Sequence, residues 1–492
     1  MKNVSVDYWR NISGQGEDGC TVLDKNWDTF QFGADEEHPG DVISSLRTCE
    51  NWEFDQTEFQ STIKSDFELV CGRDYLTSLA QTLYFVGMVM GVFTFGLLSD
   101  LFGRKKVLVP ILLAMSVSGI ITSLMPNYQT FMVARVFNAF IVIAIFETFF
   151  TYLLEFVGGK YNTIIGIGCE FIWVTGWLLL GALAYLIRDW RHLVLMYSAP
   201  SLLSVALCWL LPESPRWLLS VGRIEEAEQV VRQGAKYNGI TLPEDFHLKP
   251  VQKEKNVRRR TMIDLMKSPN MRAKTLILFY NWFVNAFAYF GLSLNMGQLT
   301  GGANIYLNFT LGGLLEIPAY IAALLILQRW GRRVPYFISM LLCGISLISI
   351  MLIPRSDETM TSQQEIQMNT FRGVFVHDWP AVVVTLIGKM CITFSWAVLF
   401  LYTAELLPTE VRTSGIGSSS FLGRFGGMLA PWIEVLGKNY HPYIPAIVFG
   451  CNALLAGLIA ILLPETQGRE LPYTIEEAEK LELKTFSAKN ES

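Results

Sequence analysis

Long runs of apolar residues constrain this chain more than any other feature. A helix that crosses the hydrocarbon core of a bilayer needs about 20 mostly apolar residues. Eleven runs of roughly that length occur, at 75–98, 107–125, 129–153, 163–187, 193–211, 275–296, 304–327, 334–353, 380–402, 413–436 and 443–463. They are too long for buried strands. We therefore expect an all-α membrane protein with eleven spans.

The composition excludes several other classes of function. Only 17% of the 492 residues are charged, against about 25% in soluble proteins. The net charge is −5, whereas a nucleic-acid binder usually carries an excess of basic residues. We therefore expect no nucleic acid as a partner, and the apolar runs predict a lipid bilayer. No P-loop, zinc spacing or nucleophile–base pattern occurs. We therefore expect that the protein is not an enzyme and that it needs no cofactor and no metal. The driving force is left open between Na⁺, protons and the membrane potential.

Basic residues give the orientation of the spans. Three basic segments, 103–106, 258–260 and 329–333, fall on one side of the membrane if the spans alternate. Short loops rich in Lys and Arg face the cytoplasm. Residues 1–74 are then extracellular, and residues 464–492 form a cytoplasmic tail. We expect a multi-pass protein of the plasma membrane.

The expected extracellular segment is acidic and contains cysteines. Residues 1–74 carry six basic and sixteen acidic side chains, a balance of −10. Cys20, Cys49 and Cys71 lie where disulfides persist, and their pairing stays open, with one of the three left over. The sequons at Asn3 and Asn11 predict glycosylation.

The chain also repeats itself. Three motifs occur twice in the same order: Gly103-Arg104-Lys105 and Gly331-Arg332-Arg333, Glu155 and Glu405 after a span, and Pro212-Glu213 and Pro464-Glu465. This repetition indicates two homologous halves, 75–211 and 275–463, joined by a cytoplasmic linker at 212–274. Many secondary transporters are built from such halves, with the substrate site between them near the bilayer midplane.

Several motifs resemble those of a known family. Residues 96–106 resemble the signature loop of the major facilitator superfamily, and residues 212–217 resemble a motif of sugar and organic-ion porters. The finer matches are 49–54, 67–71, 188–191, 289–294, 316–319 and 402–412. Together they resemble the organic cation/anion/carnitine (zwitterion) transporter family, with the carnitine and organic cation branch the most similar.

The resemblance implies a fold and a conformational latch. The implied fold is the major facilitator fold with two parallel six-helix halves, of which the first helix has no counterpart here. The segment 354–379 is longer and more polar than the family's usual turn, and we assign it no role. We expect charged pairs at the cytoplasmic ends of the helices to form in one state and break in the other. The expected latch residues are Asp100, Arg104, Lys105, Glu155, Glu213, Arg216, Glu405 and Arg412.

Charged residues inside the predicted spans are candidates for substrate contact, because each costs at least about 2.5–3.5 kcal/mol to insert. The resemblance implies arginine at position 424 in anion and carnitine carriers and aspartate in cation carriers. Arg424 could bind a carboxylate, or pair internally with a glutamate such as Glu316. Glu316 could balance an ammonium or Arg424. Lys389 could bind chloride or a carboxylate, or pair with an acid. Arg135, Glu147 and Glu434 are weaker candidates.

Aromatic residues accompany these charges. At about 100° per residue, Glu170, Trp173 and Trp177 form one stripe of a helix. A carboxylate beside indoles suits an alkylammonium group, although ordinary core packing would also explain the tryptophans. Phe146 and Tyr289 match aromatic positions that line the family's cavity.

These residues predict a function. We expect transport of small organic cations or zwitterions of the carnitine or quaternary-ammonium kind, by alternating access. An organic-anion exchanger, favoured by Arg424 and Lys389, is one alternative. A truncated, non-transporting paralogue or isoform is another. The oligomeric state is left open.

Overall fold

The computed structural model of the chain forms two compact units, residues 1–77 and 78–492, which are considered separately. It describes residues 20–23, 46–49, 51–157, 161–243, 246–248, 262–294, 305–352, 379–408, 411–441, 443–468, 472 and 474–480. The predicted glycosylation sites Asn3 and Asn11, the arginines at 258–260 and nearly all of the segment 354–379 lie outside these residues.

The first unit contains a strand pair that the apolar pattern did not predict. β1 (Thr21–Leu23) pairs with β2 (Leu46–Thr48) in antiparallel register. The short helices α2 (Ile63–Asp66) and η2 (Cys71–Arg73) follow. A disulfide joins Cys20 to Cys71, and Cys49 keeps a free thiol. The structure thus selects one of the pairings that the sequence left open.

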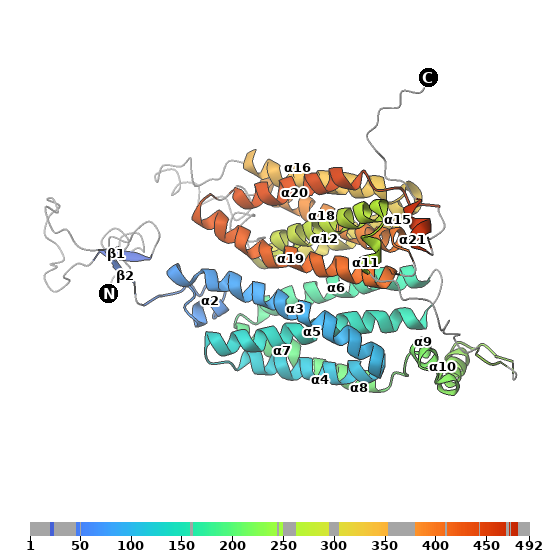
Figure 1. Ribbon diagram of the computed structural model, residues 1–492. Helices are drawn as coiled ribbons and strands as arrows, with labels where there is room; N and C mark the ends of the chain where they lie inside the picture. The colour runs from blue at the N-terminus through green and yellow to red at the C-terminus, as the bar shows by residue number, and fades with distance from the viewer. Residues whose placement is uncertain are drawn as a thin grey trace, which may run out of the picture. The chain divides into compact units, whose positions relative to one another are not determined.

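The second unit is a bundle of long helices in two groups (Figure 1). The first group comprises α3 (Tyr75–Phe102), α4 (Arg104–Ser123), α5 (Tyr128–Phe156), α6 (Tyr161–Leu186), α7 (Trp190–Ser198) and α8 (Ser201–Trp209). The second comprises α12 (Pro269–Leu294), α14 (Ile305–Leu314), α15 (Glu316–Trp330), α16 (Arg333–Ser349), η3 (Ile350–Leu352), α18 (Trp379–Leu406), α19 (Arg412–Asn439) and α20 (Ile444–Ala460). We call these groups the first and second halves.

Shorter helices lie outside the two halves. The linker contains α9 (Pro215–Ser220), α10 (Ile224–Tyr237) and α11 (Met262–Leu265), and the tail contains α21 (Ile475–Glu479). The carboxylate of Glu479 accepts the N–H groups of Asn270 and Met271 at 2.9 and 2.7 Å. The tail helix therefore caps the first turn of α12, where helical N–H groups lack partners of their own.

All eleven predicted runs fall on helices, which confirms the all-α class. Within the described residues, nine helical segments are long and apolar enough to cross a membrane. The last two predicted runs correspond to α19 and α20. α19 is less apolar than the other long helices, and α20 has only 17 residues. The count of eleven spans therefore stays a prediction.

Two predicted runs are each interrupted by proline. The run 193–211 divides into α7 and α8 at Pro200, and the run 304–327 divides into α14 and α15 just before Pro318. Proline has no N–H to donate to the carbonyl four residues earlier. Pro318 thus removes the bond to Leu314, where α14 ends. This break places Glu316 in the first turn of α15.

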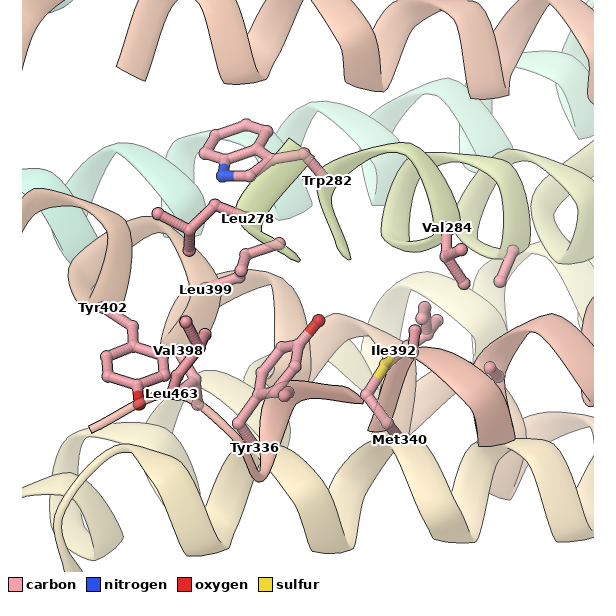
Figure 2. Packing of buried hydrophobic residues seen from close by; sticks show 14 of the residues in the cluster. Leu278, Trp282, Val284, Tyr336, Met340, Ile392, Val398, Leu399, Tyr402 and Leu463 are labelled. Atoms are coloured by element: carbon pink, nitrogen blue, oxygen red, sulfur yellow. The ribbon is translucent and has the colours of Figure 1, made fainter. Parts of the chain in front are cut away.

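The largest buried core lies in the second half. α12, α16 and α18 contribute Leu278, Trp282, Tyr336, Met340 and Leu399, all less than 3% exposed (Figure 2). By contrast, α3 exposes apolar side chains such as Leu97 and Leu101. A helix that is apolar on all sides suits a lipid environment. The core makes the second half a packed unit that can hold charged side chains in fixed positions.

Candidate functional site

A buried ion pair lies in the second half. The Nζ of Lys389 on α18 is 3.0 Å from Oε1 of Glu316 on α15, and both side chains are 0% exposed. Lys389 also donates to Oγ of Ser293 at 2.6 Å, and the hydroxyl of Tyr289 donates to Glu316 Oε1 at 2.9 Å. The lysine Nζ lies 3.4 Å from the centroid of the Tyr289 ring. The charges are thus held by several contacts at once.

One oxygen of this pair has no partner. Glu316 Oε2 is buried and accepts no hydrogen bond from any residue that the structure describes. Buried polar atoms in proteins almost always have a partner. Among the described residues, this carboxylate oxygen therefore keeps unused capacity to accept a hydrogen bond.

The predicted stripe on α6 faces this ion pair. Trp173 Nε1–H donates to the Tyr289 hydroxyl oxygen at 3.4 Å. The Tyr320 hydroxyl donates to Glu170 Oε2 at 3.1 Å. Trp177 stacks on Phe309 with ring centroids 4.5 Å apart, and its indole centroid lies 5.2 Å from Nζ of Lys389. All three stripe residues thus contact the second half, so the cluster spans both halves.

Arg424 is paired elsewhere. Its Nη2 is 2.8 Å from Oε1 of Glu147 on α5, and its Nη1 donates to Ser420 Oγ at 2.9 Å. The internal partner is therefore Glu147 in the first half, not Glu316, whose ion-pair partner is Lys389. Glu147 lies nine residues before the end of α5, and Arg424 twelve residues after the start of α19. This similar depth was the one sequence signal that could have suggested the pair.

The remaining candidates in the spans have other surroundings. Phe146, beside Glu147, stacks on Phe150 and is 46% exposed. Arg135 donates to Gln81 Oε1 at 3.0 Å and lies over the Tyr84 ring. Glu434 pairs with Lys438 on its own helix. None of these residues joins the Lys389–Glu316 cluster through a contact among the described residues.

The first repeated motif builds a charge cluster at the loop end of the first half. Arg104 Nε lies 3.1 and 3.0 Å from the two Glu155 oxygens, and Nη2 donates to Glu155 Oε1 at 2.8 Å. Its Nη1 contacts the Ser99 carbonyl and Asp100 Oδ1, both at 2.8 Å. The carboxylate of Glu213 completes what we call the Arg104 cluster (Arg104, Glu155, Glu213).

Backbone groups attach Glu213 to this cluster. Its Oε1 accepts the N–H groups of Lys105 and Ser214, both at 3.0 Å. Lys105 thus takes part through its backbone. Arg216 donates to the Val157 carbonyl at 3.0 Å. Gly103 adopts φ +105°, and an added Cβ would lie 2.5 Å from Glu213 Oε2, so only glycine fits at this turn.

The second copy of the motif builds an equivalent cluster, the Arg332 cluster (Arg332, Glu405, Glu465). Arg332 Nε contacts both Glu405 oxygens at 3.2 and 2.9 Å, Nη2 donates to Glu405 Oε1 at 2.8 Å, and Nη1 donates to the Leu327 carbonyl at 2.8 Å. Arg332 and Glu465 were not among the predicted latch residues, although the repeated motifs already contained both.

Glu465 is held by four backbone N–H groups, those of Arg332, Arg333, Thr466 and Gln467, at 2.9–3.1 Å. Burial opposes its ionisation, but the hydrogen bonds from these N–H groups outweigh burial and hold the pKa of the Glu465 carboxyl below its usual range.

No ion pair between Arg412 and a carboxylate is found among the described residues. Its Nε donates to the Leu407 carbonyl at 3.2 Å, and its Nη2 is buried without a hydrogen-bond partner among the described residues. Each cluster instead joins helices of one half, because Glu155 ends α5 beside α4 and Glu405 ends α18 beside α16. The latch role of these residues stays a prediction.

Comparisons with known proteins give the context of this arrangement. A family model described as sugar (and other) transporter matches residues 30–478. The organic cation transporter protein of Drosophila melanogaster is 34% identical over 489 residues, which cover 97% of this chain and 84% of the relative. Organic cation/carnitine transporter 2 of Homo sapiens is 34% identical over 432 residues, covering 87% of this chain and 73% of the relative.

Solved structures share the fold. The partially occluded inward open conformation of the xylose transporter XylE from E. coli matches with a TM-score of 0.60 and 18% identity, over 81% of this chain and 90% of that chain. These matches confirm the predicted major facilitator fold and the resemblance to organic cation and carnitine transporters. Because the relatives are named as transporters, they also confirm the expectation that the chain is not an enzyme.

Proposed function

The chain belongs to the sugar (and other) transporter family of the major facilitator superfamily, and from this premise we propose that it carries small organic cations or zwitterions across the plasma membrane. Two relatives whose names include organic cations or carnitine support this substrate class. In this proposal residues 1–74 are extracellular and the C-terminus is cytoplasmic.

The observation that carries the proposal is the charge balance of the cluster between the halves. Glu170 and Glu316 contribute two carboxylates, and Lys389 contributes one ammonium. One negative charge is therefore in excess if both acids are ionised. Trp173 and Tyr289 place aromatic rings next to these acids. An alkylammonium group is attracted both by a carboxylate and by the face of an aromatic ring.

The same cluster suits alternating access. Trp173 and Glu170 belong to the first half, and their partners Tyr289 and Tyr320 belong to the second. These two contacts must rearrange if the halves rock about a site at their interface. The pairs Arg104–Glu155 and Arg332–Glu405, each between helices of one half, would hold those helices together during that motion. Coupling to Na⁺, to protons or to the membrane potential would supply the driving force.

Uptake into cells expressing the chain tests the proposal. We expect saturable uptake of radiolabelled tetraethylammonium, with carnitine as competitor. Glu170→Gln should lower cation uptake about tenfold or more, because the carboxylate that attracts the quaternary ammonium is lost. Glu225→Gln, on the exposed surface of α10, is the matched control and should behave as the unmodified chain.

Protein abundance at the cell surface is measured in parallel. If the chain reaches the surface and the uptake of tetraethylammonium equals that of cells without the chain, the proposed function is wrong. An uptake that Glu170→Gln and Glu225→Gln affect equally would contradict the assignment of the site.

A further inference from the structure

A charged pair that lies away from the Lys389–Glu316 cluster joins the two halves. Arg424 on α19 and Glu147 on α5 approach to 2.8 Å. The arginine side chain is 11% exposed and that of Glu147 is 38% exposed. Both residues lie deep in their helices. At a rise of 1.5 Å per residue, Glu147 lies about 14 Å from the end of α5, and Arg424 lies about 18 Å from the start of α19.

The exposure of Glu147 shows which environment the pair faces. An ionised carboxylate at this depth is costly in contact with lipid and is found facing a bundle interior or a water-filled cavity. Its partner is on the opposite half, so the pair lies at the interface between the halves. A solute in that interface could reach the Glu147 carboxylate.

Arg424 has little free hydrogen-bonding capacity on one edge. A guanidinium binds carboxylates best when two N–H groups are directed at the same anion. Here Nη2 is engaged by Glu147 and Nη1 by Ser420. A substrate carboxylate that approached this edge would have to displace Glu147, whereas a cation could contact the exposed part of the Glu147 carboxylate without breaking the pair.

We propose that Glu147 is a specificity-determining residue: it acts as the internal counter-ion of Arg424 and disfavours organic anions as substrates. This inference rests on the proposed transport function and adds to it the reason why a carrier with an arginine at this site would prefer cations. The mechanism is selectivity by an unfavourable replacement, since an anion that takes the place of Glu147 on Nη2 must release a carboxylate already bound there.

Aromatic contacts near the pair also join the halves. Phe150, one turn beyond Glu147, meets Phe400 of α18 with ring centroids 6.1 Å apart. Phe421, one turn before Arg424, meets Phe93 of α3 at 5.2 Å. Because these contacts join α5 to α18 and α19 to α3 without the charges, removal of the Glu147 charge should change selectivity more than the association of the halves.

The test compares an anion and a cation as ligands of one set of variants. Inhibition of tetraethylammonium uptake by p-aminohippurate gives the anion affinity, and the KM of tetraethylammonium gives the cation affinity. Glu147→Gln should raise the affinity for p-aminohippurate about tenfold, as expected for release of one charge-assisted hydrogen bond. The affinity for tetraethylammonium should fall or stay constant.

Three further variants serve as controls. Glu147→Asp keeps the charge and should retain the low anion affinity. The double variant Glu147→Gln with Arg424→Gln should lose the gained anion affinity. Glu434→Gln, a glutamate that pairs with Lys438 on its own helix, should change neither affinity. If Glu147→Gln leaves the anion affinity unchanged, or moves both affinities in the same direction, Glu147 does not determine specificity.

A binding measurement separates this inference from the proposed function. The thermal stability of the purified full chain is measured with and without p-aminohippurate. Greater stabilisation of Glu147→Gln than of the unmodified chain supports the role of Glu147 even if no tetraethylammonium uptake is found, in which case only the proposed transport function fails. Equal stabilisation overturns the inference.

Discussion

The Arg104 and Arg332 clusters are two versions of one design. In both, a glycine with positive φ directly precedes the arginine. The Nε and Nη2 of that arginine bind a glutamate at the end of a long helix. In both, Nη1 donates to the carbonyl five residues earlier. A second glutamate, from the motif that follows the last helix of each half, accepts backbone N–H groups. The sequence repeat is therefore also a repeat of contacts.

The two clusters differ in how they balance charge. Arg104 pairs with two carboxylates, Asp100 and Glu155, whereas Glu405 makes the only ion pair found for Arg332 among the described residues. The position of Asp100 is occupied by Gln328 in the second half. The second half instead uses Thr466, whose hydroxyl donates to Glu405 Oε2 at 2.5 Å.

The backbone-bound glutamates differ as well. Glu465 accepts four N–H groups, and Glu213 accepts two and has a buried Oε2 without a hydrogen-bond partner in the described part of the chain. The two clusters therefore share the geometry of the turn. In the second cluster, however, the arginine depends on one carboxylate, and the backbone-bound glutamate accepts more hydrogen bonds. Loss of one glutamate should therefore affect the second cluster more.

The largest difference is expected for the arginine-bound glutamates. Glu405→Ala leaves Arg332, 18% exposed, without its carboxylate, and should cost about 4 kcal/mol, as for other broken buried pairs. Glu155→Ala leaves Arg104 with the exposed Asp100, and should cost about 3 kcal/mol because an exposed pair adds about 1 kcal/mol or less. Thermal unfolding of the purified variants measures the order.

A compensating variant sharpens this prediction. Gln328→Asp places a carboxylate at the position equivalent to Asp100. It should restore part of the melting temperature of Glu405→Ala, by an amount that corresponds to about 1 kcal/mol. A Glu155→Ala variant less stable than Glu405→Ala would contradict the expected order of the two losses.

The next effect concerns the backbone-bound glutamates. Glu465→Gln removes the charge to which four N–H groups donate and should cost about 2 kcal/mol, whereas Glu213→Gln affects two such bonds and should cost about 1 kcal/mol. The two variants are compared by thermal unfolding at neutral pH. Equal losses would mean that the number of donors does not set the stability of this turn.

The same residue predicts a pH dependence. Because the pKa of folded Glu465 lies below its usual range, its contribution to stability is complete above the unfolded carboxyl pKa of about 4.3 and is lost as the pH falls through the folded pKa. Melting temperatures of the unmodified chain and of Glu465→Gln, measured from about pH 6 to about pH 3.5, should converge at the acidic end. A constant difference across this range would contradict the assignment.

The smallest effect is expected for the hydroxyls. Thr466→Val removes the bond to Glu405, and Ser214→Ala removes the side chain that caps α9 through the Trp217 N–H. Each should cost about 1 kcal/mol. Double-mutant cycles distinguish the roles of the two hydroxyls, since Thr466 should be coupled to Glu405 and Ser214 should not be coupled to Glu155. Equal coupling would show that the two clusters work alike.

Much of this arrangement could be predicted from the sequence. Apolar runs located the helices, because span length and hydropathy are properties of local sequence, and the repeats located both arginines. The disulfide between Cys20 and Cys71 and the breaks before Pro318 and at Pro200 refine those predictions.

The partner of Arg424 could not be predicted in the same way. Charge and depth allow several acids, and only the packing of α5 against the second half selects Glu147 over Glu316. Similarly, the pattern placed Glu170 and Trp173 on one face of a helix, but only the fold showed that this face meets Tyr320 and Tyr289. Pairings between distant helices depend on tertiary packing, and the periodicity of the local sequence contains no information about that packing.

In the proposed function, the acidic, aromatic cluster between the halves binds an organic cation for transport. Tetraethylammonium counterflow into liposomes that contain only the purified full chain tests it most directly. Unlabelled tetraethylammonium trapped inside should accelerate the uptake of labelled compound, and Glu316→Gln should abolish this acceleration. Uptake by the folded, unmodified chain that is no faster than into protein-free liposomes would contradict the claim.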